Sequence, residues 1–119
     1  MKRLFLFAVL FMAGFNLAQA HAFLAQAEPK VGSTAEGSPS VVKIWFTMEV
    51  QPARSDIEVF ETGGKEIDRK DVKVDATDKA LMSVSVPSLA PGTYRVVWHA
   101  VCPFGHHTSG TFSFQVTAR

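Results

Sequence analysis

The chain has 119 residues, 47% of them hydrophobic, with 12 basic and 11 acidic residues and a formal net charge of +1. This length allows one compact domain and is too short for two. The near-neutral charge removes the usual electrostatic basis for binding nucleic acids or anionic membranes.

The first twenty residues have the pattern of a secretory signal peptide. Basic residues at 2 and 3 precede an apolar run over 4–15, and the small-x-small sequence Ala-Gln-Ala occupies 18–20. At about 12 residues the apolar run is shorter than the roughly 20 that a membrane-spanning helix needs. We therefore expect 1–20 to be a cleaved signal peptide and 21–119 to be an exported domain, in the periplasm or the extracellular space, that is not embedded in the membrane.

Cleavage would leave 99 of the 119 residues, with 10 basic and 11 acidic side chains and a charge of −1. Cys102 is the single cysteine, so no intrachain disulfide can form. A lone thiol in an oxidising compartment is buried and inert, a metal ligand or an intermolecular crosslink, and the sequence leaves these alternatives open.

From residue 22 onward apolar residues recur with period two, and Gly, Pro, Ser and Asp interrupt them about every ten positions. This pattern predicts seven strands, at 23–28, 41–46, 56–60, 72–74, 81–86, 93–101 and 110–117. Seven short strands without a cysteine pair predict an all-β fold, an immunoglobulin-like Greek-key β-sandwich or partly closed barrel.

Alternation along these strands assigns their faces. In the longest strand it places one set of residues toward the core and the set 95, 97, 99 and 101 outward. The residues expected to face inward are Val42, Ile44, Phe46, Tyr94, Val96, Trp98, Ala100, Phe112, Phe114 and Val116.

The four histidines are the residues that indicate chemistry. His99, His106 and His107 lie within nine residues of one another, and His21 would become the amino terminus after cleavage. An N-terminal histidine can chelate a metal through its α-amine and its imidazole, and such nitrogens suit copper(II). The alternatives are that His21 is terminal only by the accident of cleavage and that the other three are ordinary surface residues.

Several segments carry a resemblance to a known family: 21–24 (HAFL), 28–33 (EPKVGS), 44–47 (IWFT), 91–98 (PGTYRVVW), 105–106 (GH) and 109–114 (SGTFSF). In their order and spacing the chain resembles the copper-resistance protein C (CopC) family over essentially its whole mature length. The resemblance implies a periplasmic copper-binding protein with an immunoglobulin-like sandwich. It also implies that His21 and His106 hold copper(II), because the family's loop histidine stands eight residues after a tryptophan and four before a glycine, as His106 does relative to Trp98 and Gly110.

The sequence departs from the family's pattern at two positions. The family's loop usually reads Asp-x-His, but the residue two before His106 is Phe104. Many members also carry a glutamate where this chain has Met48, and Glu49 falls on the opposite face of an extended strand. With Cys102 nearby, the loss of two oxygen ligands raises the hypothesis of a site biased toward copper(I) or weakened for copper(II).

Three functions remain open. The first is a copper-binding protein, not an enzyme, that sequesters the ion or delivers it to a membrane copper transporter. The second is a copper-free interaction module, which Phe104 and Met48 favour. The third is a copper monooxygenase with a histidine brace, for which so small a domain offers little substrate-binding surface. We expect a monomer, because no long exposed apolar stretch indicates dimerisation.

Overall fold

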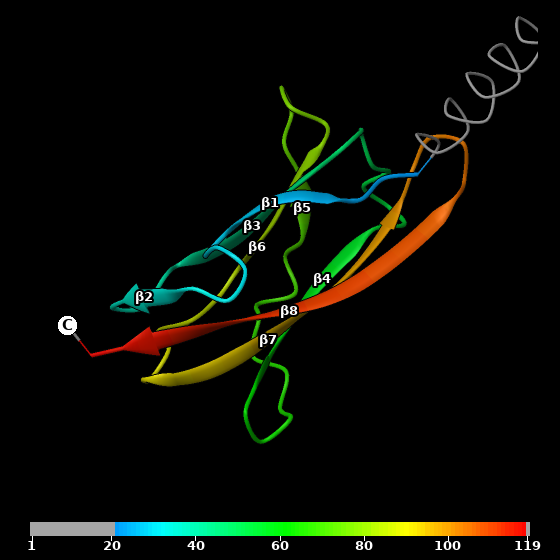
Figure 1. Ribbon diagram of the computed structural model, residues 1–119. Coiled ribbons are helices and arrows are strands. Elements are labelled where there is room, and N and C mark those ends of the chain that lie inside the picture. The colour runs from blue at the N-terminus through cyan, green and yellow to red at the C-terminus, as the bar shows by residue number, and fades with distance from the viewer. Residues whose placement is uncertain (1–20, 119) are drawn as a thin grey trace, which may run out of the picture.

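The computed structural model describes residues 21–118, and the predicted signal peptide at 1–20 lies outside the described residues. The described chain is built of strands and loops, and it contains no helix of the length and hydropathy that a membrane span requires. Figure 1 labels the strands, which are β1 (Leu24–Glu28), β2 (Thr34–Glu36), β3 (Val41–Phe46), β4 (Asp56–Glu61), β5 (Lys73–Val74), β6 (Leu81–Ser85), β7 (Gly92–Val101) and β8 (His107–Thr117).

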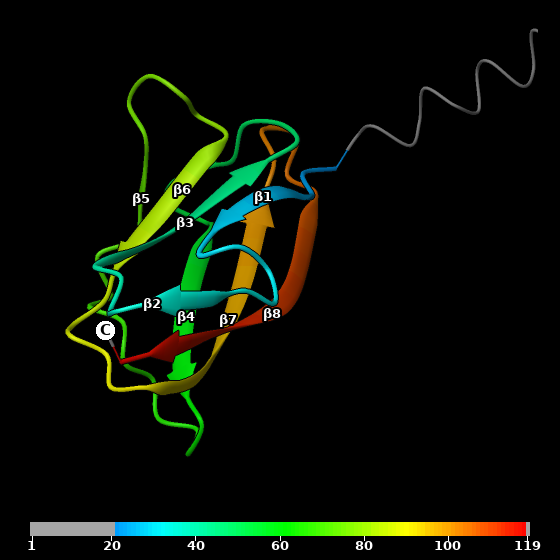
Figure 2. The same cartoon turned by 60° about the vertical axis from the view of Figure 1, so that its left-hand side comes forward.

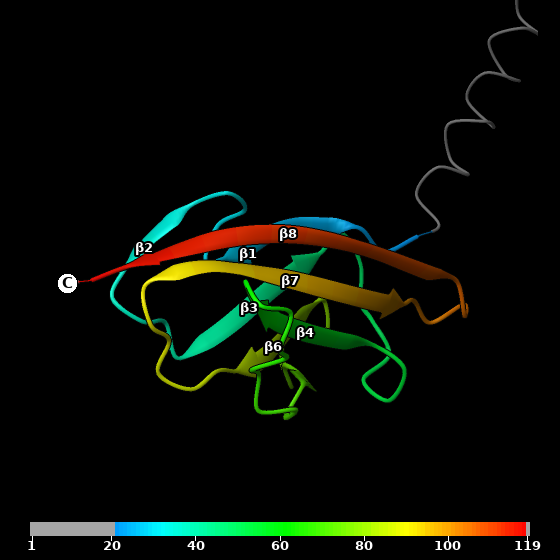
Figure 3. The ribbon, with the colours of Figure 1, turned by 90° about the horizontal axis from the view of Figure 1, so that it is seen from below.

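The strands form two four-stranded sheets that face each other, as Figures 2 and 3 show from two directions. One sheet has the strand order β1-β3-β6-β5 and the other β2-β8-β7-β4. Neighbouring strands are antiparallel except for β2 and β8, which are parallel. This two-sheet architecture confirms the predicted all-β sandwich.

Strand β2 is an addition to the predicted strands. Its three residues have no buried side chain, so the sequence carries no alternation that would indicate it. The strand is held by main-chain bonds beside it: Gly32 N donates to Ser113 O at 2.7 Å, and Gln115 N donates to Ser33 O at 2.9 Å. Strand β8 also begins earlier than predicted, at His107 instead of residue 110.

The predicted inward residues of β3, β7 and β8 are all buried and form the core between the sheets. Val101 corrects the assignment of the outer face of β7, because it is only 1% exposed. The loop after β3 is hydrogen-bonded to its main chain: Gln51 N donates to Val101 O at 2.8 Å, and Val101 N donates to the hydroxyl of Ser55 at 3.0 Å. Alternation within one strand cannot reveal a loop that lies against the end of that strand.

Trp98 and Gly110 are paired across β7 and β8. A Cβ atom at position 110 would lie 2.7 Å from Cζ2 of Trp98, which is far inside van der Waals contact. The same indole meets the ring of Phe46 edge to face, with centroids 5.2 Å apart. Glycine at 110 therefore lets the indole lie against β8 while it packs on the opposite sheet.

Candidate metal centre

The first described residues lie beside the start of β8, as Figures 1 and 2 both show. Ala22 is fully buried, and its carbonyl accepts a hydrogen bond from the hydroxyl of Thr108 on β8. The backbone N–H of Thr47, which follows β3, donates to Phe23 O at 2.8 Å. These contacts hold His21 at the end of the sandwich where β7 turns into β8.

A tight turn joins β7 to β8 and positions the second histidine. Gly105 N donates to Cys102 O at 2.9 Å, and Cys102 N donates to His106 O at 3.1 Å. Gly105 has a φ of +85°, a conformation that glycine adopts without a steric penalty. The turn fixes the backbone of His106 immediately before β8 begins.

The rings of His21 and His106 lie 4.7 Å apart, centroid to centroid, with an angle of 32° between their planes. An imidazole nitrogen bonds a transition metal at about 2 Å, so two rings that share one ion have centres roughly 4.5–6 Å apart. The observed separation falls in that range. His106 is exposed and His21 is half-buried, so an ion from solvent can reach both.

The other two histidines are directed elsewhere. Nε2 of His107 lies 3.4 Å from Nη2 of Arg54. Because a guanidinium only donates, this contact uses Nε2 of His107 as the acceptor. Nε2 of His99 lies 4.0 Å from the carboxylate of Glu58 across the outer face of the sheet.

The side chains considered as additional ligands are dispersed. Met48 is half-buried and packs on the core, Glu49 is exposed, and Cys102 is fully buried. Phe104 is 75% exposed at the tip of the turn. Within residues 21–118 no group of three or more His, Cys, Asp or Glu is arranged to hold a metal ion. The centre therefore offers two imidazoles, and in a chain that begins at His21 the α-amine would be a third nitrogen.

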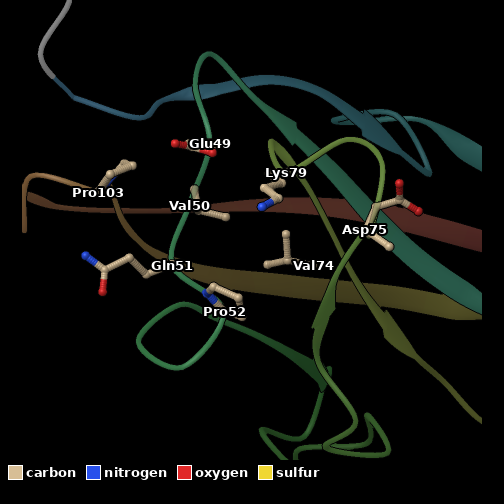
Figure 4. Close-up of a pocket in the computed structure, with 9 residues that line it drawn as sticks. Glu49, Val50, Gln51, Pro52, Val74, Asp75, Lys79 and Pro103 are labelled. Atoms are coloured by element: carbon tan, nitrogen blue, oxygen red, sulfur yellow. The ribbon is translucent and has the colours of Figure 1, made fainter.

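A groove of about 390 Å³ lies next to this turn and shares Pro103 with it (Figure 4). Figure 4 shows Val50, Val74 and Lys79 turned toward the middle of the groove and Asp75 turned away. The backbone N–H groups of Asp78 and Thr77 donate to Asp75 and lower its pKa. The lining residues are Glu49, Val50, Gln51, Pro52, Val74, Asp75, Ala76, Lys79 and Pro103. Because the lining has no histidine, the groove is separate from the pair of imidazoles.

Sequence reasoning does not single out Thr47, Thr108 or Arg54, all of which contact the residues around the centre. Thr108 has a signal that could have found it. Alternation in β8 places position 108 on the same inward face as Gly110 and Phe112, and a hydroxyl on an inward face needs a partner.

Comparisons with a family model and with known proteins point to one protein family. Residues 24–117 match the model of the CopC domain, a span that begins just after His21 and includes His106. The chain is 31% identical over 100 residues to Protein YobA of Escherichia coli (strain K12), covering 82% of this chain and 79% of that protein. It is 28% identical over 98 residues to Copper transport protein CutJ of Bacillus subtilis (strain 168), where the match spans only 18% of that protein.

Solved structures of copper resistance proteins resemble this chain in fold. The crystal structure of CopC from Methylosinus trichosporium OB3b superposes with a TM-score of 0.78 at 30% identity, covering 83% of this chain and 96% of that one. PcoC, a methionine-rich copper resistance protein from Escherichia coli, superposes with a TM-score of 0.73 at 25% identity, covering 82% of this chain and 100% of that one.

Proposed function

This chain belongs to the CopC domain family, and from that premise we propose that it is a periplasmic copper-binding protein. Residues 1–20 are removed on export, and the mature chain begins at His21. Copper is the cargo, bound by the α-amine and imidazole of His21 together with the imidazole of His106. The protein sequesters the ion or delivers it to a membrane copper transporter, without acting as an enzyme.

The observation that carries this proposal is the 4.7 Å separation of the His21 and His106 rings. The two residues come from opposite ends of the described chain, and the turn at 102–106 and the anchored segment 21–23 bring them together. Three nitrogen donors from two residues match the preference of copper(II) for amine and imidazole ligands. The contact of His107 with Arg54 supports His106 as the partner of His21.

The positions of the sulfur-bearing side chains favour copper(II) over copper(I) at this centre. The hypothesis of a softer site requires Met48 or Cys102 to reach the metal, but Cys102 is fully buried and Met48 packs against the core. Met82 is also fully buried. The proposed site is therefore rich in nitrogen and has no thioether ligand.

The copper-free interaction module remains the second candidate. The absence of a three-residue ligand group within residues 21–118 and the exposed Phe104 at the family's aspartate position favour it. Metal analysis of the protein recovered from the periplasm separates the two, with intact-mass spectrometry to check that it starts at His21.

One copper(II) per chain, with nitrogen hyperfine lines in the electron-spin-resonance spectrum, is the result that the proposed function requires. If the protein binds copper in neither oxidation state, the copper-free interaction module becomes the better-supported function. Reductant-dependent production of peroxide by the copper-loaded protein would instead indicate an enzyme.

A further inference from the structure

We propose that Thr47 and Thr108 are positioning residues that clamp the backbone of residues 21–23 and so hold His21 against His106. We call these two residues the threonine clamp. The inference rests on the proposed function, because the position of His21 matters only if the residue binds the metal. It adds to the metal centre two side chains that do not touch the ion.

Thr47 bonds to the segment on one side, from the loop that follows β3. Its hydroxyl oxygen accepts a hydrogen bond from Phe23 N at 3.0 Å and donates to His21 O at 3.4 Å. Its backbone N–H donates to Phe23 O at 2.8 Å. One threonine thus bridges the residue that carries the ligand and the residue just before β1.

Thr108 bonds to the segment from the opposite sheet. It lies in β8, opposite Ala100, two residues after His106. Its hydroxyl donates to Ala22 O, and the methyl group of Ala22 is fully buried between the two sheets. The clamp therefore ties the first residues of the domain to both sheets at once.

The threonine clamp lowers the entropy cost of binding the metal ion. Terminal residues are disordered unless they are tied down, and an ion that binds a disordered residue must first order it at a cost in entropy. The threonine hydroxyls order the backbone before copper arrives. Because Thr108 and His106 lie on the same short stretch of chain, the bond to Ala22 also fixes the distance between the two ligand-bearing segments.

The test uses isosteric substitutions in the protein that begins at His21. Thr47→Val and Thr108→Val remove each hydroxyl while keeping the shape, and Thr47→Ser and Thr108→Ser restore it. Thr111→Val is the matched control, since Thr111 is exposed on the outer face of β8. Copper(II) affinity is measured by competition with a chelator. Hydrogen exchange of the backbone amides at positions 23 and 47, which bond between the segment and the loop after β3, is measured on the metal-free protein.

Each lost hydrogen bond should weaken copper(II) binding by about three- to tenfold and speed exchange of the amides at positions 23 and 47 by a similar factor. The serine variants and Thr111→Val should behave like the unmodified protein. The electron-spin-resonance spectrum of Thr47→Val or Thr108→Val should shift, which a loss of global stability alone would not produce.

Two failures can be told apart. If the unmodified protein binds copper and His21→Ala abolishes binding, but both valine variants match Thr111→Val, the threonine clamp is wrong and the metal centre stands. If the unmodified protein binds no copper, the proposed function is wrong, and the positioning role is wrong with it. A valine variant that does not fold is replaced by its serine and alanine counterparts, whose difference in copper affinity gives the same answer.

Discussion

The indole of Trp98 occupies the space that a side chain at Gly110 would need, with a Cβ at that position falling 2.7 Å from Cζ2 of the indole. This contact lies in the β7–β8 pair just beyond the turn that carries His106. It joins the packing of the core to β8, the strand that begins beside the candidate metal centre.

Gly110→Ala should therefore lower the free energy of unfolding by about 1–3 kcal/mol, because the core must yield to the added methyl group. Urea denaturation measures the change. Gly63→Ala is the control, since its added Cβ would meet its nearest neighbour at an ordinary 3.6 Å. Equal stability of the two variants would show that the indole moves aside without cost.

His106→Ala and His107→Ala should separate the two neighbouring histidines. His106 faces His21, whereas His107 contacts Arg54. We expect His106→Ala to weaken copper(II) binding by at least about 100-fold, since it removes a ligand outright. His107→Ala should leave affinity nearly unchanged. Competition titrations on both variants provide the measurement, and the reverse ranking would assign the metal to His107.

Phe104→Asp should strengthen copper(II) binding. The side chain is 75% exposed, so its replacement costs little packing, and a carboxylate two residues before His106 would supply the missing oxygen donor. We expect an increase of roughly tenfold, about 1.4 kcal/mol of binding free energy. Phe104→Asn controls for the loss of the ring without adding charge. If both variants bind equally, the carboxylate does not reach the ion.

Asp75 should make part of the stability dependent on acid pH. Backbone N–H groups of Asp78 and Thr77 donate to its carboxylate and lower its pKa below the ordinary value of 3.8. A pKa that is lower in the folded state stabilises the fold above pH 3.8, and this contribution is lost as the pH falls through the folded value. Asp75→Asn should be less stable at pH 7, and its deficit should shrink below pH 3.8 in urea titrations. A deficit that stays constant with pH would contradict the assignment.

Much of the fold could be predicted because its long strands bury one face each. The alternation in β7 and β8 specifies both the strands and their inward residues, and these residues form most of one wall of the core. Strand β2 could not be predicted in this way. Its pairing depends on main-chain bonds to β8, which leave no mark on side-chain hydropathy.

For the candidate site, the sequence suggests a pair of residues but not their geometry. The resemblance implied His21 and His106, and the structure brings their rings into contact. The side chains that hold the first residues in place, Thr47 and Thr108, are polar residues whose partners are main-chain atoms far away in sequence. Only the packing of the two sheets reveals such partners.

A copper centre anchored on the amino terminus of His21 is tested most directly by copper(II) binding to the protein that begins at His21, compared with the same protein carrying one extra N-terminal alanine. The extension moves the free amine off His21 but keeps both imidazoles. We expect one copper(II) per chain in the first protein and a large loss of affinity and of the nitrogen hyperfine pattern in the second. Identical binding by the two proteins would contradict a centre anchored on the amino terminus of His21.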